Sequence, residues 1–123
     1  TWLKQLFGNQ LWLGAGRFLS GNDDAWLAEC QHLAHSAGIP VVACNDVHMH
    51  RRSRQALQDT LTAIRLGRPL AELGYALFAN GERHLRPLPR LTQLYPADWL
   101  QQSLTIAARC RFSLAELRYE YPR

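Results

Sequence analysis

The sequence predicts an α/β fold that consists of one βαβ unit followed by a mainly helical segment. Two short apolar runs, at residues 11–15 and 41–45, indicate the strands, and a helical pattern lies between them at about 22–37. A strand, a helix and a second strand in this order predict two parallel strands joined by a right-handed crossover. Two strands leave long unpaired edges, so we expect further chain or a second copy to cover the sheet.

The first helix has clear start and stop signals. Asn22 is a favourable N-cap residue, and acidic residues follow it in the first turn, where they interact favourably with the helix dipole. Gly38 and Pro40 are typical of a helix end. Apolar residues recur at helical spacing between these signals and predict the buried side of the helix. They are Trp26, Leu27, Cys30, Leu33, Ala34 and Ala37.

The second strand ends in candidate metal ligands. Asp46, His48 and His50 alternate along the chain, so in extended backbone their side chains point to one face. A carboxylate with neutral imidazoles suits zinc or another first-row divalent ion. In α/β proteins, ligands just past the carboxyl ends of strands lie where active sites are usually built. A polar strand end followed by a solvated loop explains the same residues equally well.

The second half of the chain is predicted to be mainly helical. Ser53 is the expected cap of a second helix that ends at Gly67. The segment that follows is irregular, and its Asn80-Gly81 pair is a strong turn signal. After a short helical turn, Pro96 opens a third helix at its first position. The predicted inner residues are Leu57, Leu61 and Ile64 in the second helix and Trp99, Leu100, Ser103, Leu104, Ile106, Ala107 and Cys110 in the third.

The composition is that of one globular domain. The chain has 123 residues, of which 47% are hydrophobic, and no apolar run approaches the roughly 20 residues of a membrane span. Three widely spaced cysteines do not fit a disulfide framework, so we expect reduced thiols and a cytoplasmic protein. Thr1 is not an initiator methionine, and residues 2–7 lack the features of a signal peptide. We therefore expect a piece of a longer protein that has no membrane partner.

The net charge of +4 comes almost wholly from arginine. Arg51, Arg52 and Arg54 follow the candidate metal ligands directly. Arginine concentrated beside a possible metal site favours a phosphate-bearing partner. The alternative is an ordinary solvated helix surface, which carries similar charges.

Several stretches occur in an order that is typical of one family. Residues 45–54 read Asn-Asp-Val-His-Met-His-Arg-Arg-Ser-Arg, and residues 61–67 read Leu-Thr-Ala-Ile-Arg-Leu-Gly. Glu-Arg-His-Leu-Arg at 82–86, Ala-Ala-Arg-Cys at 107–110 and Leu-Arg-Tyr-Glu-Tyr-Pro at 117–122 continue the pattern. This order resembles the bacterial C-family DNA polymerases, and within them the error-prone branch used in damage-induced mutagenesis. The resemblance covers nearly the whole chain.

The resemblance implies a fold and a set of ligands. Residues 1–67 would form the last strands and helices of a PHP (polymerase and histidinol phosphatase) β/α barrel. Residues 68–123 would form a helical segment that leads toward the polymerase palm. Asp46 and His48 match the last metal-binding Asp-x-His motif of that barrel, and His50 is a further candidate ligand. Zinc or manganese is the implied metal.

The resemblance also implies a function for the full-length protein. That protein would be a DNA-directed DNA polymerase, a nucleotidyltransferase that uses magnesium and deoxynucleotides in DNA repair and translesion synthesis. Its implied partners are DNA, a sliding clamp and mutagenesis accessory proteins. Arg51, Arg52 and Arg54 would face the DNA. The acidic residues of the palm are not in this chain, so we expect the chain alone to be inactive.

Two alternatives belong to other classes. In the first, the domain is a non-catalytic PHP scaffold for contacts between domains and partners, and Asp46 and His48 are remnants of a metal site. In the second, the domain is a PHP-type metal-dependent phosphoesterase, in which metal ions polarise a phosphate and activate water.

Overall fold

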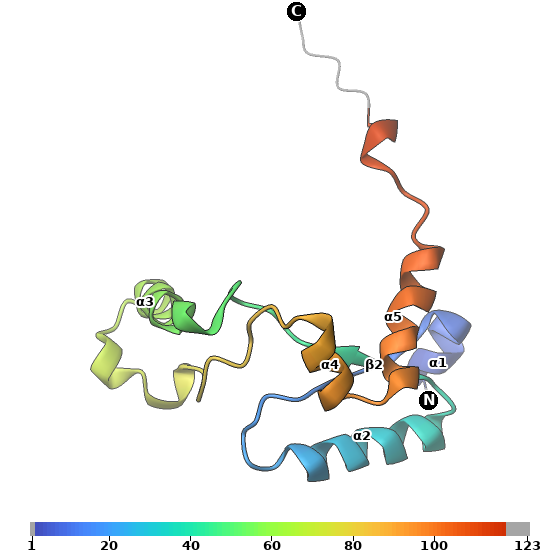
Figure 1. Cartoon of the computed structure of the whole chain (residues 1–123), viewed down its shortest axis with the longest axis horizontal. Helices are drawn as coiled ribbons and strands as arrows, with labels where there is room; N and C mark the ends of the chain where they lie inside the picture. The colour runs from blue at the N-terminus through green and yellow to red at the C-terminus, as the bar shows by residue number, and fades with distance from the viewer. Residues whose placement is uncertain (1, 118–123) are drawn as a thin grey trace, which may run out of the picture.

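The computed structural model describes residues 2–117 and shows a mixed arrangement of helices around a small sheet (Figure 1). This arrangement is compatible with the predicted α/β class. A short helix at the start of the described chain was not predicted. Of the stretch at 117–122 that carries part of the family resemblance, residues 118–122 lie outside the described residues. The helices and strands are α1 Trp2–Phe7, β1 Leu13–Gly16, α2 Asp23–Ala37, β2 Val41–Cys44, α3 Gln55–Leu66, α4 Leu88–Leu94 and α5 Ala97–Arg109.

The two strands form the predicted βαβ unit. β1 pairs with β2 in parallel, with Leu13 opposite Val41 and Gly16 opposite Cys44, and α2 makes the connection. The prediction of a parallel pair joined by a helix is therefore confirmed. The sheet of the described residues has only these two strands. A complete β/α barrel would need further strands, so the barrel remains a proposal for a longer protein.

Two glycines end the long helices as predicted. Gly38 and Gly67 both have left-handed backbone with φ of 62°, and their N–H groups bond to carbonyl groups in the last turns of α2 and α3. Glycine adopts this conformation without the steric cost that a Cβ atom brings. The position of each glycine was sufficient to predict the helix end, because this kind of cap depends only on residues in the last turn of the helix.

The predicted N-terminal caps were less successful. Asn22 precedes α2 as expected, but its side chain makes no capping hydrogen bond. Ser53 is not the cap of α3: it lies inside a 3-10 turn, Arg52–Arg54, and Arg54 occupies the capping position. The chain leaves β2 through this tight turn before the helix begins, which moves the start of α3 two residues beyond Ser53. Helix α5 begins one residue after Pro96.

The core lies where α2 and α5 pack on the sheet. α2 contacts both strands, and α5 packs on β2 and contacts α4. Burial of these apolar side chains is the main stabilising contribution to this half of the molecule. The buried residues are Ala15, Cys30, Ala34, Val41, Leu94, Tyr95 and Trp99.

The predicted inner side of α3 is wrong for this chain. Leu57, Leu61 and Ile64 are 50%, 53% and 71% exposed. Figure 1 shows α3 lying apart from α2 and α5, so neither of these helices covers its apolar side. The prediction was partly right for α2 and α5, in which Cys30 and Trp99 are buried among the core residues.

The hydroxyl group of Tyr95 connects the ends of the two strands. It accepts a hydrogen bond from the N–H of Arg17 at 2.8 Å and donates one to the carbonyl of Cys44 at 2.9 Å. Both backbone groups lie just at the carboxyl ends of β1 and β2. Since a buried polar group without a partner costs about 1–3 kcal/mol, this hydroxyl satisfies groups that would otherwise destabilise the sheet end.

Helix α5 also reaches back to the segment before β1. Gln102 accepts a hydrogen bond from the indole N–H of Trp12 at 3.0 Å. Arg109 donates to the carbonyl of Asn9 at 2.6 Å, and its guanidinium lies 5.1 Å from the centre of the Trp12 ring. These contacts join α5 to the segment between α1 and β1.

The three cysteines are free thiols, as predicted. Cys30 is buried, and its burial together with the nearby Glu29 carboxylate raises the pKa of the thiol above its usual range. Cys44 and Cys110 are exposed. No helix among residues 2–117 has the length and apolar character that crossing a membrane requires.

Candidate functional site

Both strands end at the same side of the sheet because they are parallel. We call this region the carboxyl edge and define it by three segments, residues 17–23 after β1, residues 45–51 after β2 and residues 77–86 before α4. Hydrogen bonds link all three segments, as described below. The predicted metal ligands and the first predicted DNA-facing arginine lie in the second of them.

Asp23 fixes the first segment of the carboxyl edge. Its buried carboxylate accepts hydrogen bonds from the N–H groups of Phe18 and Ser20, both at 2.7 Å. Burial by itself raises the pKa of Asp23, but these backbone hydrogen bonds and the positive charge of Arg17 outweigh it and leave the pKa below its usual value. The ionised form is therefore the one that holds the loop.

Replacing Asp23 with asparagine is expected to change how stability depends on pH. A carboxyl whose pKa is lower in the folded chain contributes stability above its unfolded pKa of about 3.9, and this contribution is lost as pH falls through the folded pKa. The Asp23→Asn variant should lose about 1–3 kcal/mol at pH 7. Urea denaturation at pH values from neutral to strongly acidic would measure both effects.

Asp98→Asn is the matched control for this prediction, because Asp98 is an exposed acid in the first turn of α5. Below the folded pKa of Asp23, the Asp23→Asn variant should approach the wild-type stability. If the two proteins lost stability in parallel as the pH fell, the role given to Asp23 would be wrong.

The structure places Asp46 beside His48, whereas His50 lines a separate hollow together with His48, and Asp46 does not line it. Asp46 has left-handed backbone with φ of 41°, so the chain is not extended here and the expected alternation onto one face is wrong. His48 Nδ1 lies 2.9 Å from the Asp46 carbonyl oxygen and 3.7 Å from its carboxylate oxygen Oδ1. His50 Nε2 instead accepts a hydrogen bond from Arg51 Nε at 2.9 Å. Among residues 2–117, no three metal-ligating side chains form a cluster.

Asp46 forms an ion pair with Arg83 from the third segment. The Arg83 guanidinium carbon lies 4.0 Å from the centre of the Phe18 ring and 4.5 Å from that of Phe78. The Phe78 ring in turn packs against the ring of His48 in an edge-on arrangement with centres 4.8 Å apart. A cation beside aromatic rings is attracted by their π electrons, so this side chain is held in place on more than one side.

Backbone hydrogen bonds align the third segment with the second. The carbonyl of Arg83 accepts from the N–H groups of His48 at 2.8 Å and Met49 at 3.2 Å, and the N–H of Leu85 donates to the carbonyl of Met49 at 3.1 Å. The Asn80 side chain extends the link to the first segment, because its amide donates to the Phe18 carbonyl at 2.8 Å. The three segments thus form one connected unit.

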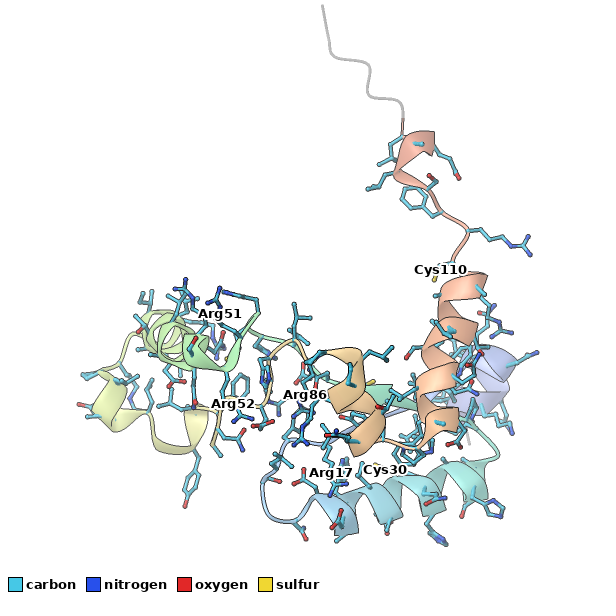
Figure 2. All side chains as sticks on the ribbon, viewed as in Figure 1. Arg17, Cys30, Arg51, Arg52, Arg86 and Cys110 are labelled. Atoms are coloured by element: carbon cyan, nitrogen blue, oxygen red, sulfur yellow. The ribbon has the colours of Figure 1, made fainter. Side chains whose placement is uncertain are left out.

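A second charge cluster joins the third segment to Arg52, in the turn before α3. Glu82 is 5% exposed and pairs with Arg52 and, at 2.9 Å, with Arg86, whose side chain is completely buried. Figure 2 shows Arg86 near the middle of the molecule and Arg52 on the side of α3. The Nε and Nη1 atoms of Arg86 have no hydrogen-bond partner in the described part of the chain. Glu82 is therefore the group that balances this buried charge.

The three predicted DNA-facing arginines differ in their surroundings. All three are exposed, but Arg52 is committed to Glu82. Arg51 contacts His50, and Arg54 lines a hollow of about 190 Å³ together with His48 and His50. Of these three arginines, Arg51 and Arg54 therefore have no acidic side chain of residues 2–117 within salt-bridge distance.

Sequence reasoning missed the residues that assemble the carboxyl edge. Glu82 lies 30 positions beyond Arg52, and Arg83 lies 37 positions beyond Asp46, and no local period or motif indicates such pairs. The sequence contains two signals here, the Asn80-Gly81 turn, which marks where the third segment bends, and the stretch at 82–86, which belongs to the family resemblance but does not indicate the pairing. The Asn80 side chain does organise this turn, since it also accepts a hydrogen bond from the N–H of Glu82 at 3.0 Å.

Comparison with known proteins defines the class of protein that this chain resembles. No family model matches the chain. It is similar over nearly its whole length to DNA polymerases, but it spans only about 12% of the length of the curated relatives it matches. The named relatives are error-prone DNA polymerases, from Methylococcus capsulatus at 65% identity over 122 residues, Pseudomonas syringae at 55% over 122 and Pseudomonas aeruginosa at 51% over 123. The predicted resemblance to this branch is confirmed.

Proposed function

We propose that this chain is a segment of an error-prone DNA polymerase and that its carboxyl edge, with the exposed Arg51 and Arg54, lies beside the DNA. The observation that carries the proposal is the 65% identity over 122 residues to a protein of that name. DNA and deoxynucleotides would be the substrates of the complete enzyme, and magnesium would serve polymerisation. DNA repair and translesion synthesis in the cytoplasm would be its setting, with a sliding clamp and accessory proteins as partners.

The geometry of the carboxyl edge favours a scaffold within such an enzyme. Asp46 is engaged by Arg83, and the segments on either side are joined by backbone hydrogen bonds. These contacts suit a rigid element that supports neighbouring parts of a larger protein. The exposed apolar side of α3 is consistent with that role, because such a surface is usually covered by another part of a protein.

The predicted zinc or manganese site at Asp46, His48 and His50 stays a proposal for the complete protein. His48 suits a ligand, since an imidazole that donates Nδ1–H to a carbonyl keeps Nε2 available. Asp46 and His50 do not fit as they stand, because both interact with arginine side chains. A phosphoesterase role would require other segments to supply ligands and Arg83 to release Asp46.

We expect the complete polypeptide to extend a primed template with deoxynucleotides.

The proposed contact with DNA is tested by replacing Arg51 and Arg54 in that polypeptide. Replacing both arginines with glutamine should weaken DNA binding for unrelated sequences alike, because phosphate contacts carry no sequence information. The slope of log affinity against log salt should fall by about 0.9 for each lost contact. Fluorescence anisotropy over a range of salt concentrations would measure it.

Arg52 is left intact in this experiment because its removal would disturb Glu82. The matched control replaces Arg65 and Arg90, two exposed arginines elsewhere on the chain, with glutamine. A folded Arg51/Arg54 double variant with the wild-type salt slope would contradict the DNA contact. Failure of the complete, folded polypeptide to extend any primer would contradict the polymerase assignment.

A further inference from the structure

We propose that the Arg83 guanidinium is the resident cation of the carboxyl edge, so that a side chain of the protein and not a divalent metal ion neutralises Asp46. The resemblance to PHP domains implies a metal at this position, and the observed contacts disagree with it. The inference concerns residues of this chain alone and does not depend on the polymerase role.

The first argument is the pairing itself. Asp46 is the single carboxylate among the three predicted ligands, and an oxygen of this carboxylate accepts from Arg83 Nη1. Divalent zinc and manganese sites usually include negatively charged ligands or several imidazoles that enclose the ion. With Asp46 engaged and His50 bonded to Arg51, one predicted ligand is left with a nitrogen suited to a metal, namely His48.

The second argument is that Arg83 is held where it is by aromatic rings. The Phe18 and Phe78 rings come from two different segments, and both lie within 4.5 Å of the guanidinium carbon. A guanidinium is planar and weakly hydrated, so it tolerates such a half-buried aromatic environment better than an ammonium group does. The Phe78 ring also packs on His48, so the arginine, the aromatic ring and the imidazole form one packed group.

The third argument is the backbone. Because the Arg83 carbonyl accepts from the N–H groups of His48 and Met49, the main chain of Arg83 is fixed next to the predicted ligands. If a metal ion displaced the guanidinium from Asp46, the main chain of Arg83 would still hold this residue close to the ion. The positive charges of the ion and of the Arg83 side chain would then repel each other, and this repulsion adds to the cost of breaking the ion pair.

The proposal is tested on the whole chain by a double-mutant cycle with Arg83→Gln and Asp46→Asn. Arg83→Gln should lower the midpoint of thermal unfolding by roughly 3–10 °C, and Asp46→Asn should lower it by less, because the Asp46 side chain is 55% exposed and Arg83 also contacts two aromatic rings. The double variant should be little worse than Arg83→Gln alone, because the second change removes a partner that has already lost its pair. Arg83→Lys keeps the charge without the planar group and should fall between wild type and Arg83→Gln. The exposed pair Arg68 and Glu72 serves as the matched control cycle and should show much weaker coupling.

Calorimetric titration with zinc chloride, and separately with manganese chloride, gives the second readout. Wild type and Asp46→Asn should bind each ion with the same affinity within about threefold, since Asp46 is not available as a ligand. This comparison does not require the Arg83→Gln variant to fold. Additive effects of the two substitutions on thermal unfolding would overturn the proposal. A loss of tenfold or more in metal affinity on replacing Asp46 would overturn it as well, because Asp46 would then bind the metal.

Discussion

Replacing Glu82 with glutamine is expected to lower the free energy of unfolding by about 3–5 kcal/mol, a very large effect for one isosteric change. Glu82 is the negative partner of the completely buried Arg86 and also pairs with Arg52. A glutamine keeps the shape and one acceptor but leaves the Arg86 charge buried without compensation. Two of the Arg86 nitrogens already lack partners among the described residues, so no other group takes over.

Urea denaturation followed by circular dichroism would measure this loss, with Glu72→Gln as the control. Glu72 also pairs with an arginine four positions away, Arg68, but both side chains are 57% exposed, so a cost of at most about 1 kcal/mol is expected. Adding Arg86→Met to Glu82→Gln should recover part of the stability, because it removes the buried charge. Equal effects of the substitutions at Glu82 and Glu72 would show that burial of the pair is unimportant.

Replacing Trp99 with alanine is expected to cost a similar amount, about 3–5 kcal/mol, for a different reason. Trp99 is 5% exposed and belongs to the core that α5 forms with the sheet. The substitution removes a large apolar side chain and leaves a cavity that the surrounding helices fill only in part. Thermal and urea unfolding should both report the loss.

Trp26 provides the comparison for Trp99. It was predicted to be an inner residue of α2, but the structure leaves it 54% exposed. Trp26→Ala should therefore cost less than about 1 kcal/mol in this chain. The sequence pattern predicts similar losses of unfolding free energy for Trp99→Ala and Trp26→Ala, whereas the structure predicts a much larger loss for Trp99→Ala. Comparing the two losses therefore tests the core that the structure defines. A larger loss at Trp26 than at Trp99 would mean that the packing of the two helices has been misassigned.

The features predicted well from the sequence are those that depend on neighbouring residues. Gly38 and Gly67 end their helices because the left-handed conformation is a local property of glycine. The parallel pairing of β1 and β2 followed from the order of strand, helix and strand, since the handedness of this unit leaves few alternatives. The irregular segment after α3 and its Asn80-Gly81 turn were visible for the same reason.

The features predicted poorly depend on contacts between distant parts of the chain. The periodic apolar residues of α3 indicate a helix with one apolar side, but the pattern does not say which part of a protein covers that side. Asp46 was predicted to share a face with His48 and His50 on the assumption of extended backbone, and its left-handed conformation removes that relation. Its partner Arg83 is 37 positions away, where residue spacing contains no information about pairing.

The reach of α5 across the sheet has a consequence for the order of folding during synthesis. β1, α2 and β2 leave the ribosome first, but the Tyr95 hydroxyl that joins the ends of β1 and β2 comes later. So do Gln102 and Arg109, which hold the segment before β1. At usual rates of translation the roughly 65 residues from Cys44 to Arg109 take about 3–13 s. For that time the apolar side of the nascent sheet that α5 covers is exposed, and such exposed apolar surface makes an incomplete chain prone to aggregation.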